Sequence, residues 1–191
     1  MKRVFDFIIS LFALIILSPL FLLISLIILI GDGKPVLFRQ KRVGKNNELF
    51  TIYKFRTMKR GTENVASGKL ENANAKITKF GRILRATSID ELPQLFNILN
   101  GTMSLVGPRP LIPEETEIRE LREKYNVYTI RPGIMGWAQV NGRDTISLEQ
   151  KALLDKEYVE KQSLGFDIKI LIMTVLKVLR REDVNEGNNR A

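Results

Sequence analysis

Residues Phe7 to Ile30 read FIISLFALIILSPLFLLISLIILI and contain no charged side chain. An α-helix rises about 1.5 Å per residue, so this segment forms a helix of about 36 Å, enough to cross the ~30 Å hydrocarbon core of a bilayer. Ser18 and Pro19 lie near its middle. Proline removes a backbone donor and clashes with the preceding turn, which predicts a kink or break between two arms of about 12 residues.

Both flanks of this apolar segment are basic. Lys2 and Arg3 precede it. The basic residues that follow it are Lys34, Arg39, Lys41, Arg42 and Lys45. Because positive charge stays on the cytoplasmic side, both ends are expected in the cytoplasm, which favours a re-entrant hairpin. A kinked single span also tolerates proline and satisfies the length, so the residues alone support the two arrangements equally.

The whole chain has 191 residues, which suits one domain with an appendage. It carries 30 Lys and Arg against 21 Asp and Glu, a formal net charge of +9 that indicates an anionic partner. Cysteine and histidine are absent. Their absence excludes disulfides, thiol catalysis, zinc fingers and a Ser-His-Asp triad. A catalytic site must use carboxylates, basic side chains and hydroxyls, and any metal in it is a hard ion such as Mg²⁺.

Beyond Gly33 the pattern predicts an α+β domain that is predominantly helical. Apolar and aromatic residues at 36–38 and 49–58, joined by the turn-like 44–47, predict a basic β-hairpin. The polar stretch 61–74 predicts a surface loop. We therefore divide the chain into a membrane helix, residues 1–31, and a catalytic domain, residues 32–191.

Helical periodicity and end signals then recur to the end of the chain. The expected helices are 78–86, 88–99, 114–128, 147–161 and 166–181. The segment 114–128 is expected to present a solvated charged face, and 131–143 a Gly-rich loop that holds Trp137. The last helix sets lysines and arginines opposite a broad apolar face, which suits an anionic membrane surface and core packing equally well.

Asp90 and Glu91 are the most informative pair of residues in this basic chain. Ser88 and Glu91 have the spacing of a capping box, in which the glutamate reaches back to the cap amide, and periodicity alone favours that role. The same position also suits chemistry, because a helix N-terminus favours the ionised carboxylate. Two adjacent carboxylates can then divide attack on phosphorus, metal binding and proton transfer between them.

Several arginines stand in or beside Gly/Pro-rich loops and helix ends. Guanidinium is a planar fork suited to phosphate, and such loops present it rigidly. The arginines placed in this way are Arg85, Arg109, Arg131 and Arg143. Any one of them is more often a surface ion-pair partner, so the placements suggest a phosphate site without specifying it.

The motifs FRQKRVG (38–44), YKFRTM (53–58), GRILR (81–85), SIDELPQLFN (88–97), SLVGPRP (104–110) and RPGIMGWAQVNGR (131–143) follow one another along the chain. In order and spacing they resemble the bacterial sugar transferase family, small monotopic phosphoglycosyl transferases that act on polyprenyl phosphate. With the N-terminal Ser-Pro segment the resemblance covers nearly the whole chain. Met135 departs from it, because a small hydroxyl residue, usually threonine, is expected there.

This resemblance implies a reaction. Members of the family transfer sugar-1-phosphate from a UDP-sugar to undecaprenyl phosphate, release UMP and require Mg²⁺. Carried over to this chain, Asp90 is the nucleophile that forms a covalent phosphosugar intermediate, and Glu91 assists with metal or proton, so that both are metal-site candidates. The phosphate ligands implied by the resemblance are Arg56, Arg85, Arg109, Arg131 and Arg143. The break at Ser18-Pro19 matches the family's re-entrant membrane helix.

The resemblance also implies partners and a location. The partners are a UDP-sugar donor, undecaprenyl phosphate, membrane lipids and a second copy of the chain in a homodimer, and no nucleic acid is expected. The protein is expected to be monotopic in the bacterial inner membrane, with its catalytic domain on the cytoplasmic face and interfacial amphipathic helices beside it. Its task would be the first membrane step of glycoconjugate and polysaccharide assembly.

The donor sugar is less closely specified. Larger relatives with extra membrane helices often transfer hexose phosphates, whereas the minimal catalytic unit resembles relatives that use N-acetylated amino sugars. We therefore expect an amino-sugar donor, with UDP-glucose or UDP-galactose as the alternative. Two other classes compete with catalysis: a membrane-tethered protein that binds anionic ligands, and a membrane scaffold in which Asp90 and Glu91 only cap a helix.

Overall fold

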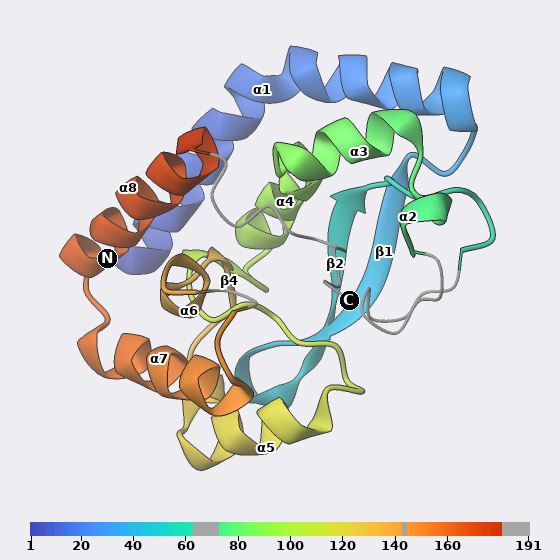
Figure 1. The fold of residues 1–191 in the computed structure, drawn as a ribbon. Helices are drawn as coiled ribbons and strands as arrows, with labels where there is room; N and C mark the ends of the chain where they lie inside the picture. The colour runs from blue at the N-terminus through green and yellow to red at the C-terminus, as the bar shows by residue number, and fades with distance from the viewer. Residues whose placement is uncertain (63–72, 143–144, 181–191) are drawn as a thin grey trace.

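The computed structural model describes residues 1–62, 73–142 and 145–180. Its first element is helix α1 (Lys2–Asp32), which contains Pro19. Figure 1 shows α1 as two arms that meet at a bend. The helix is therefore bent but not interrupted, so of the kink or break predicted at Ser18-Pro19 the structure shows a kink and no break. The Ser18 hydroxyl donates to the carbonyl of Ile15 at 2.8 Å, and Gly33 ends the helix with a φ of 72°.

Helix α1 packs against the rest of the molecule along both arms. Phe5, Leu14 and Leu17 contact the main hydrophobic core. Ile24 and Ile28 form a second cluster with Phe55 and Leu84 and are almost completely buried. Packing alone would suit a soluble helix, but α1 also exposes many large apolar side chains.

Polar contacts fix the first turns of α1. Asp6 is buried and accepts hydrogen bonds from the Ser104 hydroxyl at 2.7 Å and the Leu105 amide at 3.3 Å. Lys2 lies 2.5 Å from Asp167, which also accepts a hydrogen bond from the Tyr158 hydroxyl. Since these partners belong to distant parts of the chain, the start of α1 is an integral part of the folded domain.

The predicted hairpin is confirmed. Strands β1 (Leu37–Val43) and β2 (Leu49–Phe55) pair antiparallel, with Leu37 opposite Phe55 and Val43 opposite Leu49. The short 3₁₀ turn η1 (Lys45–Asn47) joins them. Side chains alternate between the two faces of a strand, so Phe38 and Lys54, which are opposite each other, share one face.

A second, two-stranded sheet was not predicted. Strand β3 (Ser104–Val106) pairs in parallel with β4 (Gly133–Met135). A Cβ atom on Gly133 would lie 2.1 Å from the amide nitrogen of Gly107, so only glycine permits this close approach. The stretch 131–143, expected to be a loop, thus contains β4 and the short helix α6 (Trp137–Val140). The expectation of a loop was wrong because the short motif lacks the strand-length alternation that signals pairing.

The remaining helices surround these strands (Figure 1). They are α2 (Ala73–Lys76), α3 (Lys79–Ala86), α4 (Gln94–Leu99), α5 (Thr116–Lys124), α7 (Leu148–Lys161) and α8 (Leu164–Arg180). The predicted helices at 78–86, 147–161 and 166–181 correspond to α3, α7 and α8. The predicted loop 61–74 falls largely on residues 63–72, outside the described residues.

Two predicted helices differ from the structure. The stretch 88–99 is divided into the 3₁₀ turn η3 (Ile89–Glu91) and α4, and 114–128 into α5 and the 3₁₀ turn η4 (Val127–Thr129). The charged face expected on 114–128 is not wholly solvated, because Arg122 is buried against Asp155. Charge in the sequence does not reveal a buried partner on another helix.

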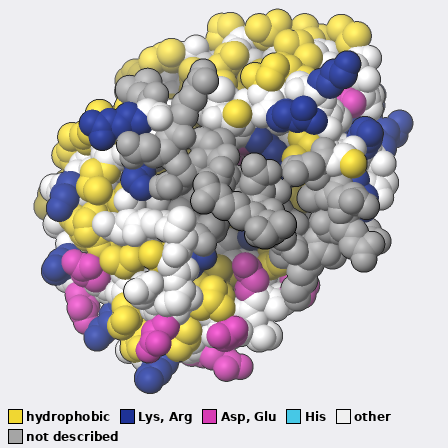
Figure 2. All heavy atoms as spheres, viewed as in Figure 1, with side chains coloured by type: hydrophobic (Ala, Val, Ile, Leu, Met, Phe, Trp, Pro, Cys, Tyr) yellow, Lys and Arg dark blue, Asp and Glu magenta, His cyan; other side chains and the backbone are white. Residues whose placement is uncertain are grey.

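Among the described residues, α1 is the single helix long and apolar enough to cross a membrane. Its exposed apolar side chains include Phe12, Ile16, Leu22 and Ile30. Figure 2 shows hydrophobic side chains along the edge formed by α1, with lysines and arginines beside them. Helix α8 adds five exposed apolar side chains: Ile168, Ile172, Val175, Leu176 and Val178. Exposed apolar surface of this kind is typical of sites that contact a membrane or another protein.

Candidate active site

Asp90 lies in η3, between α3 and α4. Ser88, the residue before η3, adopts a left-handed conformation with φ of 55° and makes no side-chain capping hydrogen bond. The capping box predicted for Ser88 and Glu91 is therefore absent from this turn. Asp90 is nevertheless only 8% exposed and lines a pocket. A buried carboxylate that faces a pocket instead of capping a helix is a candidate for chemistry.

Glu91 points toward cations from two other elements. Its Oε1 atom lies 2.6 Å from the Lys54 ammonium of β2 and 3.4 Å from the Arg109 guanidinium. Lys54 was not singled out from the sequence, where it was one of many basic residues of the hairpin. Lys54 is paired with Phe38 across the hairpin and lies on the pocket side. This pairing is the signal that could have identified Lys54 as a site residue. These contacts hold the Glu91 carboxylate in a defined orientation beside Asp90.

The pocket has a volume of about 290 Å³ and lies between the hairpin, the segment after β2, α3 and the loop after β3. Polar side chains that line it are Gln40, Arg42, Lys54, Arg56, Thr57, Lys59, Arg60, Thr62, Arg85, Asp90 and Arg109. Seven of these are lysine or arginine, while Asp90 is the one acidic residue among the described residues of the lining. So strong an excess of positive charge around one carboxylate suits a polyanionic ligand.

Arg85 reaches this pocket through Thr57. Its Nε donates to the Thr57 hydroxyl at 2.9 Å, and the Thr57 carbonyl accepts from the Thr78 amide at 3.0 Å. Gly81 of α3 lies so close that a Cβ there would be 2.1 Å from the Thr57 oxygen. This close packing of α3 against the end of β2 fixes the guanidinium at the pocket wall.

Arg109 is held through its backbone. The Arg122 guanidinium donates to the Arg109 carbonyl at 2.7 Å and pairs with Asp155 at 2.5 Å. Arg122 and Asp155 are both almost completely buried. A buried ion pair with this additional hydrogen bond therefore fixes the loop that carries Arg109 into the site.

Arg42 is another pocket residue that the sequence analysis did not single out for chemistry. Its guanidinium donates to Gln40 at 2.5 Å and to the Pro110 carbonyl at 3.1 Å. Burial, followed by the charge of Arg109, lowers the pKa of Arg42 to about 10. It stays charged at neutral pH, but its surroundings already hold much positive charge and little water. An anion bound here would relieve that repulsion.

Arg56 joins the pocket to the end of α1. Its Nη2 donates to the carbonyls of Asp32 and Gly33, at 2.9 and 2.7 Å, and the residue is 7% exposed. Its Nε and Nη1 are buried and make no hydrogen bond within the described part of the chain. A guanidinium that is buried yet incompletely hydrogen-bonded has donors available for a ligand.

The two remaining predicted arginines are Arg131 and Arg143. Arg131 donates through Nε to the Gly101 carbonyl at 2.7 Å and is absent from the lining. Arg143 lies outside the described residues. Met135, the one departure from the family motif, packs against the main core, and its carbonyl accepts from the Gly107 amide. That departure therefore does not alter the pocket lining.

The donor set limits how a metal could bind. Among residues 1–62, 73–142 and 145–180 there is no group of three or more acidic side chains. Mg²⁺ in nucleotide enzymes is held by one or two carboxylates together with substrate phosphates and water. Asp90, with a diphosphate in the basic pocket, fits that pattern, whereas Oε1 of Glu91 is already bound by Lys54.

Comparison with known proteins gives consistent matches. The uncharacterized sugar transferase EpsL of Bacillus subtilis is 44% identical over 193 residues, covering 99% of this chain and 92% of that protein. The undecaprenyl-phosphate glucose phosphotransferase of Komagataeibacter xylinus is 41% identical over 187 residues, covering 91% of this chain but 35% of that protein. The undecaprenyl-phosphate galactose phosphotransferase of Salmonella typhimurium is 38% identical over 197 residues, 95% of this chain and 41% of that protein.

The chain thus spans less than half the length of these two phosphotransferases. The aligned part nevertheless includes nearly all of this chain, with every motif described above. A family model described as bacterial sugar transferase matches residues 1–181, from α1 to the end of α8. This chain belongs to the bacterial sugar transferase family.

Proposed function

We propose that the protein transfers sugar-1-phosphate from a UDP-sugar to undecaprenyl phosphate and releases UMP. The observation that carries this proposal is the buried Asp90 carboxylate in a pocket next to the exposed apolar helix α1. Within the part of the chain that the structure describes, the other charged residues of the pocket lining are cationic. Both substrates carry phosphate, and the acceptor is a lipid. A basic site beside an apolar membrane helix suits this pair of substrates.

Asp90 is the proposed nucleophile. One carboxylate oxygen attacks the β-phosphorus of the donor, forming an oxygen–phosphorus bond as the bond from that phosphorus to the bridging oxygen breaks. UMP leaves with the electron pair of that bond. In the second step an oxygen of the lipid phosphate attacks the same phosphorus and displaces Asp90, which regenerates the free carboxylate. Splitting the transfer in two in this way is covalent catalysis.

The cations stabilise charge that develops during both steps. Arg85 and Arg109, held by Thr57 and Arg122, present fixed guanidinium groups to the phosphates. Lys54 donates to Glu91 at 2.6 Å and orients its carboxylate next to Asp90. Asp90 is the carboxylate that would hold Mg²⁺, which would further neutralise the diphosphate, and Glu91 has the proton-handling role.

We further propose that α1 enters and leaves the membrane on one side. Its first turn pairs with Asp167 of α8 through Lys2, and its last carbonyls accept hydrogen bonds from Arg56 at the end of β2. Both ends of α1 are therefore bonded to the same folded domain. A helix that crossed the bilayer would carry its two ends to opposite sides, so these contacts support the re-entrant arrangement.

This arrangement suits the bacterial inner membrane, with the catalytic domain on the cytoplasmic face and α8 at the interface. Helix α8 exposes apolar side chains and also carries Lys169, Lys177 and Arg180, a composition suited to an anionic surface. A homodimer stays a prediction, because a single copy of the chain gives no observation of an interface.

The sugar of the UDP-sugar donor is the part of the proposal that the experiment below identifies. The expectation of an N-acetylated amino sugar stays a prediction, based only on resemblance to minimal family members. Two relatives are named as a glucose and a galactose phosphotransferase, so a UDP-hexose is the second candidate donor. Both kinds of sugar are attached to the same UDP, so the basic pocket serves either one.

The test is UMP release from a panel of UDP-sugars, including both N-acetylated amino sugars and hexoses, with undecaprenyl phosphate and Mg²⁺. The proposal requires release that depends on lipid, metal and Asp90, and the active donor identifies the sugar. A folded protein that binds UDP-sugars but releases UMP from none of them would support the ligand-binding alternative. Intact-mass measurement after incubation with donor alone would detect the phosphosugar adduct.

A further inference from the structure

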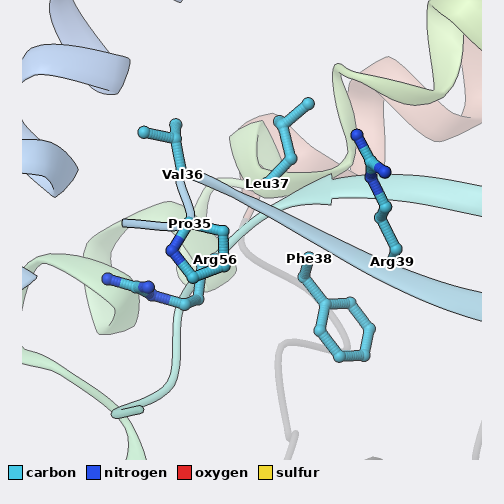
Figure 3. Close-up of a pocket in the computed structure, with 6 residues that line it drawn as sticks. All are labelled: Pro35, Val36, Leu37, Phe38, Arg39 and Arg56. Carbon is cyan, nitrogen blue, oxygen red and sulfur yellow. The ribbon is translucent and has the colours of Figure 1, made fainter. Parts of the chain in front are cut away.

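A second pocket opens beside the active-site pocket, at the start of β1. It has a volume of about 670 Å³. It is lined by Pro35, Val36, Leu37, Phe38, Arg39 and Arg56. Figure 3 shows the Phe38 ring on the opposite side of β1 from Leu37 and Arg39, with Arg56 beside Pro35. The walls are therefore mainly apolar, with two guanidinium groups among them.

This second pocket adjoins the first. Pro35, Phe38 and Arg56 line both of them. Phe38 is half-buried, yet it belongs to neither hydrophobic core cluster among the described residues. An aromatic side chain that lines two pockets without joining a core has apolar surface available to a ligand.

The second pocket also adjoins the membrane-facing helix. Val36 and Leu37 pack against the cluster formed by Ile24 and Ile28 of α1. The same arm of α1 exposes Leu22, Leu26 and Ile30. An apolar chain that lies along this arm would thus lie beside residues that line the second pocket.

Arg56 stands at the junction of the two pockets. Its Nη2 is used by the carbonyls at the end of α1, whereas its buried Nε and Nη1 make no hydrogen bond within the described residues. Arg56 lines both the mainly apolar second pocket and the basic pocket of Asp90. A ligand with an apolar chain and an anionic head matches that change in lining.

From these observations we infer that the second pocket receives the first isoprene units of the polyprenyl phosphate acceptor and that Arg56 contacts its phosphate. This inference rests on the proposed function and assigns one of its two substrates to a separate place. The donor diphosphate then occupies the pocket of Asp90, Arg85 and Arg109. The acceptor enters from the side of α1, so lipid and nucleotide do not share an entrance.

The test uses a variant that places a large side chain in the second pocket and leaves the lining of the first pocket unchanged. In Val36→Trp, a large ring occupies space at a residue that lines only the second pocket. The matched control is Leu49→Trp, which also introduces a tryptophan but at an exposed position at the other end of the hairpin. For each protein we measure stoichiometric UMP release from donor alone, and KM for undecaprenyl phosphate and for a shortened polyprenyl phosphate.

In Val36→Trp we expect the KM for both acceptors to rise about tenfold, equivalent to about 1.4 kcal/mol. UMP release from donor alone should equal that of the wild type in this variant. All values measured for Leu49→Trp should equal those of the wild type. An unchanged KM, or a change confined to the full-length acceptor, overturns the inference. Failure of the wild type to release UMP from any donor instead contradicts the proposed function itself.

If Val36→Trp does not fold, Arg39→Glu gives the same information from an exposed position at the rim of the pocket. Its negative charge repels the acceptor phosphate on entry, so KM for the acceptor is expected to rise while donor-only release stays constant. An acceptor KM equal to that of the wild type contradicts the inference.

Discussion

The Lys54 ammonium lies 2.6 Å from Oε1 of Glu91, and this contact joins the β-hairpin to the turn that carries Asp90. Arg109 approaches the same oxygen atom from the loop after β3, at 3.4 Å. Glu91 is thus directed toward the basic pocket by two cations and does not reach back to cap its own turn. The neighbouring Asp90 occupies a site whose geometry depends on three separate segments of the chain.

Loss of this contact should impair catalysis without unfolding the protein. In Lys54→Met, Glu91 loses its strongest partner, and turnover is expected to fall about tenfold. Lys54→Arg preserves the charge and should recover most of the activity. Lys41→Met, at an exposed position of the same hairpin, is the control. Equal loss in Lys54→Met and Lys41→Met, by UMP release, would show that Lys54 has no special role.

Removal of the Asp90 charge should abolish the first chemical step. Asn is nearly the same size as Asp, so Asp90→Asn is expected to fold normally but to lose about 10³-fold or more in turnover, because the amide is not a nucleophile. Intact-mass measurement should show no phosphosugar adduct. Glu149→Gln, an exposed acid in the first turn of α7, serves as the control. An adduct on Asp90→Asn would rule out the nucleophile assignment.

Elements with strong local signals were predictable from the sequence. The hairpin follows from stretches rich in apolar and aromatic residues on either side of the turn-like 44–47, and α7 begins at a capping box formed by Ser147 and Gln150. Ser88 and Glu91 present the same spacing but form no such box. The difference is tertiary: Lys54 and Arg109 offer Glu91 stronger, charged partners than a backbone amide.

Contacts between distant segments were not predictable. The β3–β4 pair depends on the close approach of Gly107 and Gly133, which short motifs rich in Gly and Pro do not reveal. Arg131 appeared equivalent to Arg109 in the sequence, yet its guanidinium is bound to the Gly101 carbonyl and does not line the pocket. Local pattern places an arginine in a loop, but only packing decides which way the loop faces.

The natural absence of cysteine allows a direct test of the arrangement of α1. Single cysteines in a short tag before Met1 and at Lys34 would flank the helix, and Ile16→Cys would lie in its exposed apolar middle. In a re-entrant helix, a membrane-impermeant maleimide should label both flanking cysteines only in inside-out membrane vesicles. The cysteine at position 16 should react only after detergent is added.

The cysteine-free parent chain is the control for background labelling. Labelling of the two flanking cysteines from opposite faces of the membrane would identify a single span and contradict the re-entrant proposal. Pro19→Ala in the same background tests the bend, because restoration of the backbone donor favours a straight helix. A straight helix should shift the flanking cysteines toward opposite faces or lower the amount of folded protein.

The buried ion pair beneath Arg109 should dominate the stability of that loop. Arg122→Met leaves Asp155 buried without its partner and is expected to cost about 3–5 kcal/mol. For a chain of this size that corresponds to a Tm lower by about 10 °C. Lys156→Met, in an exposed pair with Glu160, should change stability by less than about 1 kcal/mol.

Adding Asp155→Leu to Arg122→Met should recover stability, since an apolar pair no longer holds an uncompensated charge. It should not recover full activity, because the Arg109 carbonyl still lacks its donor. Thermal unfolding and UMP release on the same samples check both parts, and a Tm equal to that of the wild type in Arg122→Met would contradict the assigned role of the ion pair.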